Sequence, residues 1–247
     1  MPYLEIGYLP EGDYAFEESL NTLATNLSYC GEEIKTVLIT SRYADEGKSF
    51  LSMSLLKTMA GLQKRTVIVD ADLRRSKIMN QNQIHFRDEQ HFGLAHYLAG
   101  KCEMDDIVYR TNIEDAWMIP IGREVSNSLQ LLSSKRMAPL MEQLRKNFDV
   151  VIVDAPPAGV IIDAVEVAKH CDGALIVVNY NRGRRRDIAE VADAISRTEC
   201  PVLGAVLNNV DFRAFTSRSY YYRSGRYDSY YKKGYKAYDI SKKNGNK

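Results

Sequence analysis

The sequence predicts an α/β fold with a mostly parallel central sheet flanked by helices, followed by a flexible C-terminal tail. Short apolar, β-branched segments alternate with amphipathic segments between residues 36 and 207. The short segments are apolar at nearly every position, which is typical of parallel strands that helices cover on both faces. Residues 212–247 instead hold eight of the 16 tyrosines and almost no aliphatic side chains. We therefore predict a globular domain at 1–211 and a flexible tail at 212–247.

The N-terminal half of the domain has four clear elements. A helix is expected after Asp13, a favoured N-cap residue, because apolar residues recur at helical spacing over 16–27. The β-branched segment 36–40 predicts a buried strand, and 66–69 predicts a second one. Between them, 49–62 is apolar on most faces, which indicates a buried helix.

The C-terminal half repeats this alternation after a weakly patterned stretch at 76–116, which contains a helical piece near 93–99. Apolar residues recur every three or four positions over 137–144 and again over 188–195, so we expect an amphipathic helix at each. Further strands are expected at 117–121, 150–153, 174–178 and 202–207.

The composition excludes several classes of protein. With 247 residues, 45% apolar and 26% charged, the chain is neither wholly disordered nor collagen-like. Its four cysteines are far apart and form no CxxC pair, which argues against a zinc ribbon or a disulfide framework and fits a reducing compartment. No run of 18 apolar residues exists, so we expect no membrane-spanning helix. The N-terminus lacks the apolar core of a signal peptide.

Charge divides the chain at the same point as composition. The tail has ten Lys and Arg against two Asp, a net charge of +8, whereas the other 211 residues carry −7. Basic residues interleaved with aromatic ones suit non-specific contact with nucleic acid, and they also suit a solvated tail without a partner. The arginine-rich run at 182–186 has two similar interpretations, a contact with an anion and a solvated basic loop.

A phosphate-binding loop is expected at 41–49, between the strand at 36–40 and the helix that follows. Such a loop points backbone N–H groups at a phosphate, and the helix dipole favours an anion there. In a P-loop NTPase, Lys48 would reach the β- and γ-phosphates and Ser49 would bind Mg²⁺. The segment departs from the pattern GxxxxGK[ST] at Arg42, and Gly-Lys-Ser by itself also occurs by chance at helix starts.

Acidic residues follow two of the predicted strands. Asp70 and Asp72 come after 66–69, and Asp154 comes after 150–153. The carboxyl ends of parallel strands face the ligand crevice of an open α/β sheet. Because Mg²⁺ prefers oxygen ligands, these acids are candidates for a nucleotide–Mg²⁺ site, although each could also be an ordinary strand-end carboxylate.

The chain resembles the bacterial tyrosine kinases of capsule and exopolysaccharide synthesis, P-loop proteins unrelated to eukaryotic protein kinases. The resemblance runs from about Glu18 to Asp211 and continues in the tail. Gly47-Lys48-Ser49 is similar to the end of the family's Walker A motif. Further matches are Asp70-Ala71-Asp72-Leu73-Arg74 (Walker A′), Asp154-Ala155-Pro156-Pro157 (Walker B), the lesser blocks 131–137, 163–164 and 204–208, and the tyrosine cluster of the tail.

This resemblance implies an ATP- and Mg²⁺-dependent protein-tyrosine autokinase. Its catalytic residues would be Lys48, Asp70, Asp72 and Asp154. The nucleotide would contact Glu46, Gly47, Lys48, Ser49 and Asn208, and Mg²⁺ would be held by Ser49, Asp70 and Asp154. The phosphoacceptors would be Tyr220, Tyr221, Tyr222, Tyr227, Tyr230, Tyr231, Tyr235 and Tyr238.

The resemblance also implies a cellular setting. The family works with a transmembrane adaptor of the polysaccharide co-polymerase type, so the expected location is cytoplasmic and peripheral to the membrane through that adaptor. Self-association through the kinase domain and protein tyrosine substrates are expected, and specific nucleic-acid binding is not.

The chain departs from the family pattern at several positions besides Arg42, and two other functions therefore remain open. Ala44 and Asp45 replace a Pro-Gly pair in the loop, and Asn21 and Ala24 replace arginines of a subunit-contact helix. One alternative is an ATP-binding regulatory protein with weak or no kinase activity. The other is a partitioning or division-site ATPase, although Tyr43 stands where those proteins carry a lysine.

Overall fold

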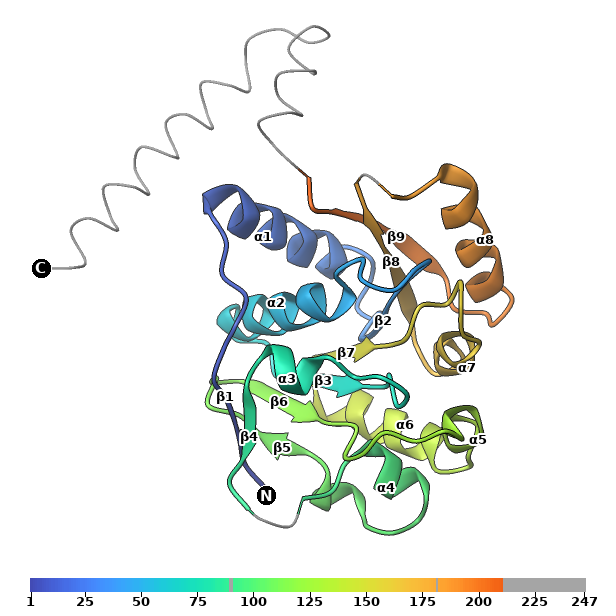
Figure 1. Cartoon of the computed structure of the whole chain (residues 1–247). Coiled ribbons are helices and arrows are strands. Elements are labelled where there is room, and N and C mark those ends of the chain that lie inside the picture. The colour runs from blue at the N-terminus through green and yellow to red at the C-terminus, as the bar shows by residue number, and fades with distance from the viewer. Residues whose placement is uncertain (89–90, 181, 211–247) are drawn as a thin grey trace, which may run out of the picture.

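The computed structural model describes residues 1–88, 91–180 and 182–210 (Figure 1). The strands are β1 (Leu4–Ile6), β2 (Thr36–Ser41), β3 (Thr66–Asp70), β4 (Ile84–Phe86), β5 (Tyr109–Arg110), β6 (Ala116–Ile119), β7 (Val150–Asp154), β8 (Gly173–Asn179) and β9 (Val202–Asn208). The α-helices are α1 (Tyr14–Ser28), α2 (Lys48–Gly61), α3 (Ile78–Gln81), α4 (Leu94–Leu98), α5 (Ser128–Leu132), α6 (Met137–Asn147), α7 (Asp163–Ala168) and α8 (Arg185–Ser196), with a short 3₁₀ turn at Met104–Asp106. The predicted tail and its eight tyrosines lie outside the described residues.

The centre of the fold is a seven-stranded sheet in the order β5-β6-β3-β7-β2-β8-β9. Neighbouring strands run parallel except at the β5 edge, where β5 pairs antiparallel with β6. The prediction of a mostly parallel sheet flanked by helices is therefore confirmed. This order places β3, β7 and β2 side by side near the middle of the sheet.

Two hydrophobic clusters cover the two faces of this sheet. Successive side chains of a strand point to opposite faces, so Leu38 belongs to one cluster while Val37 and Ile39 belong to the other. Helices α1, α2 and α3 pack on the face of Val37, and α4, α6, α7 and α8 pack on the face of Leu38 (Figure 1). Burial on both faces explains why these strands are continuously apolar in sequence.

Local sequence signals predicted the main helices and strands well. Asp13 caps α1 as expected, because its Oδ1 accepts a hydrogen bond from the Phe16 N–H over 3.0 Å. Within the weakly patterned stretch 76–116 the sequence predicts only short helical pieces near 93–99, and the structure adds α3, β4 and β5. Strand β4 pairs antiparallel with β1 in a separate two-stranded sheet. The Asn112 side chain bonds both the N–H and the carbonyl of Ile6, which ties β1 to the body.

The register of the central strands determines where the polar residues lie. Asp70, the last residue of β3, pairs directly with Asp154, the last residue of β7. Asp154 also pairs with Ile39 of β2, two residues before that strand ends. The predicted acids and the phosphate loop therefore meet at one edge of the sheet.

No helix within the described parts of the chain is long and apolar enough to cross a lipid bilayer.

Replacing Leu38 by Ala should destabilise the fold, because this side chain is completely buried at the centre of the sheet. We expect a loss of about 2–5 kcal/mol in the free energy of unfolding, from lost burial and from the cavity left behind. Urea denaturation measures this loss. Leu62→Ala is the matched control, since Leu62 is 52% exposed, and it should cost less than about 1 kcal/mol. Equal losses in both variants would contradict this packing.

Candidate functional site

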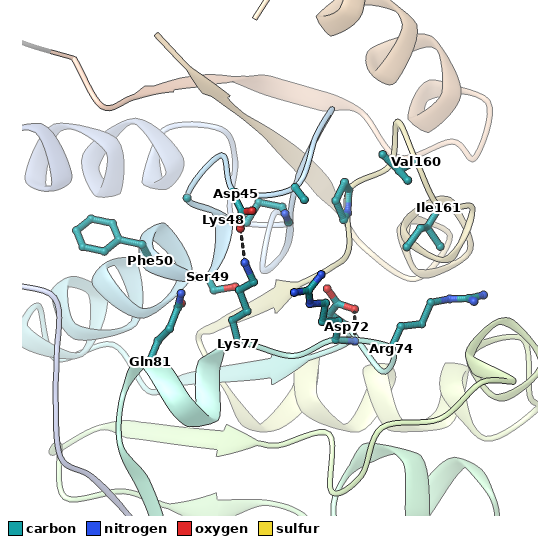
Figure 2. A pocket seen from close by; sticks show the side chains of 14 residues that line it. Asp45, Lys48, Ser49, Phe50, Asp72, Arg74, Lys77, Gln81, Val160 and Ile161 are labelled. Carbon is teal, nitrogen blue, oxygen red and sulfur yellow. Dashed lines mark hydrogen bonds and ion pairs between the residues drawn. The ribbon is translucent and has the colours of Figure 1, made fainter. Parts of the chain in front are cut away.

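A cleft of about 400 Å³ opens at the carboxyl ends of β2, β3 and β7 (Figure 2). Its lining comes from three segments: the loop and helix start at 44–50, the segment at 72–81 that follows β3, and the loop at 157–161 that follows β7. Figure 2 shows Phe50 on one side of the cleft and Val160 and Ile161 on the other. The volume lies within the range of small-molecule sites, and the position is the ligand edge of an α/β sheet.

The phosphate loop has the backbone conformation of a tight cradle. Gly47, which caps α2, has a φ of 92°, and Asp45 has a φ of 62°. The φ of Gly47 favours glycine, and a Cβ there would also lie 1.9 Å from Nδ2 of Asn208 and displace that amide. Arg42, by contrast, is not among the described residues with a positive φ. The backbone thus needs no glycine at position 42, which explains how the loop forms despite that departure from the pattern.

The side chains of Glu46 and Asn208 fix the shape of this loop. Glu46 is 1% exposed. Its carboxylate accepts hydrogen bonds from the N–H of Tyr43 over 2.8 Å and from that of Asn179 over 3.3 Å. Asn208 donates from Nδ2 to the Glu46 carbonyl over 2.9 Å. Both side chains therefore bind the loop itself, and their expected contacts with a nucleotide stay a prediction.

Lys48 lines the cleft at the start of α2 and is 8% exposed. Burial lowers the pKa of its ammonium group, and the negative charges of Asp154 and Asp72 act in the opposite direction. An ammonium group held in a partly dry cleft interacts strongly with an added anion, because little water screens the charge.

Asp154 is 2% exposed and is held by two hydroxyl groups of α2. Ser49 donates to its Oδ2 over 2.7 Å, and Ser52 donates to its Oδ1 over 2.9 Å. Burial raises the pKa of Asp154 to about 6, although Lys48 and the two serines favour the charged form. Ser52 was not among the predicted site residues. Its spacing of three from Ser49, on the same face of the helix, was the available signal.

Asp70 is completely buried beside Asp154. Ser76 donates to its Oδ2, whereas Oδ1 has no hydrogen-bond partner among the residues that the structure describes. Burial first, and the charge of Asp154 second, raise the pKa of Asp70 well above its ordinary value. Mg²⁺ prefers oxygen ligands. Asp70 offers an unpartnered buried carboxylate oxygen, Asp154 offers a second carboxylate and Ser49 offers a hydroxyl group, so these three residues fit that ion.

Asp72 differs from Asp70 because it lines the cleft. Its Oδ1 accepts a hydrogen bond from the Arg75 N–H over 3.1 Å. The two acids of the Walker A′ segment therefore have different surroundings, one inside the sheet edge and one facing the cleft. The structure brings Lys48, Ser49, Asp70, Asp72 and Asp154 together, and their catalytic and metal-binding roles stay predictions.

Basic side chains from the segment after β3 surround the cleft entrance. Lys77 forms an ion pair with Asp45 (Figure 2), and this contact lowers the pKa of the Asp45 carboxyl. The negative charge that Asp45 adds to the loop is thereby balanced.

Arg74 donates from Nε to Oδ2 of Asp163 over 2.9 Å, and Ser128 donates to the same carboxylate. Sequence reasoning assigned no function to Asp163 or Ser128.

The helix expected to make subunit contacts is α1. Asn21 is exposed, whereas Ala24 is completely buried in the hydrophobic cluster beneath the helix. Of the two positions where the family pattern has arginine, only one therefore faces solvent in this chain. Self-association through this helix stays a prediction.

Comparison with known proteins agrees with this geometry. A family profile described as an AAA domain matches residues 34–197. The tyrosine-protein kinase CpsD of Streptococcus pneumoniae serotype 4 is 32% identical over 85% of this chain and 92% of that protein.

Solved structures show the same fold. The kinase domain of the Escherichia coli tyrosine kinase ETK superposes with a TM-score of 0.73 at 28% identity, covering 78% of this chain and 75% of that one. The septum site-determining protein MinD of Pyrococcus horikoshii, solved with Mg-ADP, shares the fold alone, with a TM-score of 0.62 at 20% identity over 72% of this chain and 71% of that one. Together with the matched domain and the 32% identity along most of both chains, these likenesses show that the protein belongs to the family of bacterial tyrosine-protein kinases.

Proposed function

We propose that the protein is an ATP- and Mg²⁺-dependent protein-tyrosine autokinase that phosphorylates its own tail and regulates capsular or exopolysaccharide synthesis. The observation that carries this proposal is the convergence of five side chains at one cleft. Lys48, Ser49 and Asp72 line the cleft, and Asp70 and Asp154 lie buried beside them. Phosphoryl transfer requires mainly alignment of the reactants and neutralisation of charge, and this set of residues provides both.

The phosphates of ATP would lie over the loop that ends at Gly47. Backbone N–H groups at the start of α2 and the Lys48 ammonium group favour an anion at this point. Ser49, Asp154 and Asp70 would hold Mg²⁺, which supplies positive charge to the transferred phosphoryl group when it is bound. A protein that shares the fold was solved with Mg-ADP, which supports nucleotide binding in general but not these particular ligands.

The acceptor tyrosine requires help with its proton, because the ordinary pKa of a phenol is about 10. Asp72 lines the cleft and is the better placed of the two Walker A′ acids to accept this proton. Asp70 is completely buried, which suits it to the metal side of the site. We therefore assign different roles to these neighbouring carboxylates.

We further propose a functional division at residue 211, between a kinase domain and an acceptor tail. The eight tail tyrosines lie among glycine, serine and basic residues. Such a segment buries too little apolar area to fold by itself, so it can reach the active site of a second copy. A membrane adaptor would bring the protein to the inner surface of the membrane, and self-association there would bring tails to neighbouring clefts.

Lys48→Met should weaken ATP binding without unfolding the protein, because it removes a charge while keeping a long apolar stem. We expect at least about a tenfold loss of affinity, since hydrogen bonds to charged groups contribute about 1.5–3 kcal/mol. Calorimetry measures the affinity, and circular dichroism checks the fold. Lys64→Met, at an exposed position, is the matched control. An unchanged affinity in Lys48→Met would refute the phosphate site.

Asp154→Asn should change both activity and the pH dependence of stability. The folded pKa of about 6 lies above the ordinary 3.8, so between these values the folded chain binds more protons than the unfolded one. Wild-type stability therefore gains from this group as pH falls from 7 to 5, by up to about 1.4 kcal/mol per pH unit, and the variant lacks that gain. Phosphotransfer at pH 7 should fall at least about tenfold.

Urea unfolding of both proteins at pH 7 and pH 5 measures this difference. Asp149→Asn is the matched control, because Arg65 lowers the pKa of Asp149 and its effect on stability is constant over this range. If the stability difference between wild type and Asp154→Asn were the same at both pH values, the raised pKa of Asp154 would be wrong.

Replacing the eight tail tyrosines by phenylalanine should remove most autophosphorylation and leave ATP affinity unchanged. The full chain is incubated with labelled ATP and Mg²⁺, with and without the cytoplasmic segment of the adaptor, and phosphopeptides are then mapped. Equal labelling of the variant would place the acceptor sites elsewhere. ATP binding without labelling of the wild type in either condition would instead favour an ATP-binding regulatory protein.

A further inference from the structure

Arg42 connects three elements beside the cleft. Its Nη1 donates to the carbonyl oxygen of Gly159 over 2.8 Å, and its Nη2 lies 3.2 Å from Oε2 of Glu190. Gly159 belongs to the loop after β7, and Glu190 belongs to α8. The Arg42 side chain is only 26% exposed, and its Nε has no hydrogen-bond partner among the described residues. This arginine is therefore packed between elements rather than solvated.

The Gly159 position is shaped around Arg42. A Cβ at residue 159 would lie 2.3 Å from Arg42 Cδ and 2.5 Å from the Arg42 carbonyl oxygen. The start of the same loop is held by Thr40, whose hydroxyl donates to the Pro156 carbonyl over 2.8 Å and accepts from the Ala158 N–H over 3.1 Å. Arg42 continues this anchoring by one residue along the loop.

The anchored loop forms one wall of the cleft. The N–H groups of Val160 and Ile161 both donate to the Pro157 carbonyl over 3.0 Å, which folds the loop into a compact turn. Pro157, Val160 and Ile161 line the cleft. A displacement of Gly159 therefore moves an apolar wall that faces the phosphate loop.

We propose that Arg42 is a positioning residue that holds the loop 157–161 at the distance from the phosphate loop that an acceptor tyrosine requires. The proposal rests on the kinase function proposed above. The P-loop pattern has glycine at this position, and glycine has no side chain that could hold the loop in this way.

Two observations indicate that loss of Arg42 would weaken binding of the acceptor tyrosine rather than binding of the nucleotide. Glu46 and Asn208 hold the loop between Tyr43 and Gly47 through hydrogen bonds that do not involve the Arg42 side chain, so we expect this part of the loop to keep its shape without that side chain. Val160, by contrast, is 66% exposed, and an aliphatic wall suits contact with a phenol ring, whereas phosphates bind N–H groups and cations.

The test uses the full chain with the eight tail tyrosines replaced by phenylalanine, so that it does not label itself. A synthetic peptide with the sequence of residues 217–240 is the acceptor. Arg42→Ala should raise the KM for this peptide about five- to tenfold while the Kd for ATP changes less than about twofold. Arg42→Lys should restore part of the loss, because an ammonium group can still donate to the Gly159 carbonyl.

Arg65→Ala is the matched control, since Arg65 also pairs with a carboxylate, that of Asp149, but at the opposite end of β3. It should leave both constants unchanged. An unchanged KM for the peptide in Arg42→Ala, or an equal rise in the Kd for ATP, would overturn the proposal.

A second measurement separates this proposal from the kinase function. Amide hydrogen exchange at Val160 and Ile161 should be about tenfold faster in Arg42→Ala than in the parent or in Arg65→Ala, with or without kinase activity. If the parent transfers no phosphate to the peptide, the kinase function fails while faster exchange still supports the anchoring. Unchanged exchange would overturn the anchoring itself.

Discussion

The parallel register between β3 and β7 is the constraint on which the site depends. It places Asp70 directly beside Asp154 at the edge of the sheet, where neighbouring strands are about 4.8 Å apart. Burial raises the pKa of both carboxyl groups, and the charge of Asp154 raises that of Asp70 further. Lys48 and the hydroxyl groups of Ser49 and Ser52 lie near this pair because the phosphate loop places the start of α2 at the same edge of the sheet.

Much of this arrangement could be predicted from local sequence. The strands at 36–40, 66–69 and 150–153 are short and apolar, and a parallel sheet follows from their alternation with helices. Once the sheet is parallel, the acids that follow its strands must gather at one edge. The sequence therefore predicts the convergence of Lys48 and Asp154, since it follows from topology rather than from the details of packing.

The rest depended on contacts between distant parts of the chain. Asn208 holds the phosphate loop from 162 residues away, and no local pattern reveals such a partner. Strand β1 is three residues long, too short to show a period, and it forms because it pairs with β4. Arg42 departs from the glycine pattern, but the pattern does not say which backbone positions need a positive φ, and position 42 does not need one.

The ion pair between Asp45 and Lys77 joins the phosphate loop to the segment after β3 across the cleft entrance, and both side chains are partly exposed to solvent. Dissolved ions screen such a pair, whereas they reach the hydrogen bonds from Ser49 and Ser52 to the buried Asp154 far less. The entrance and the floor of the cleft are thus held by forces with different sensitivity to ionic strength. Added salt loosens the link between the two sides of the entrance while the polar groups beneath it keep their arrangement.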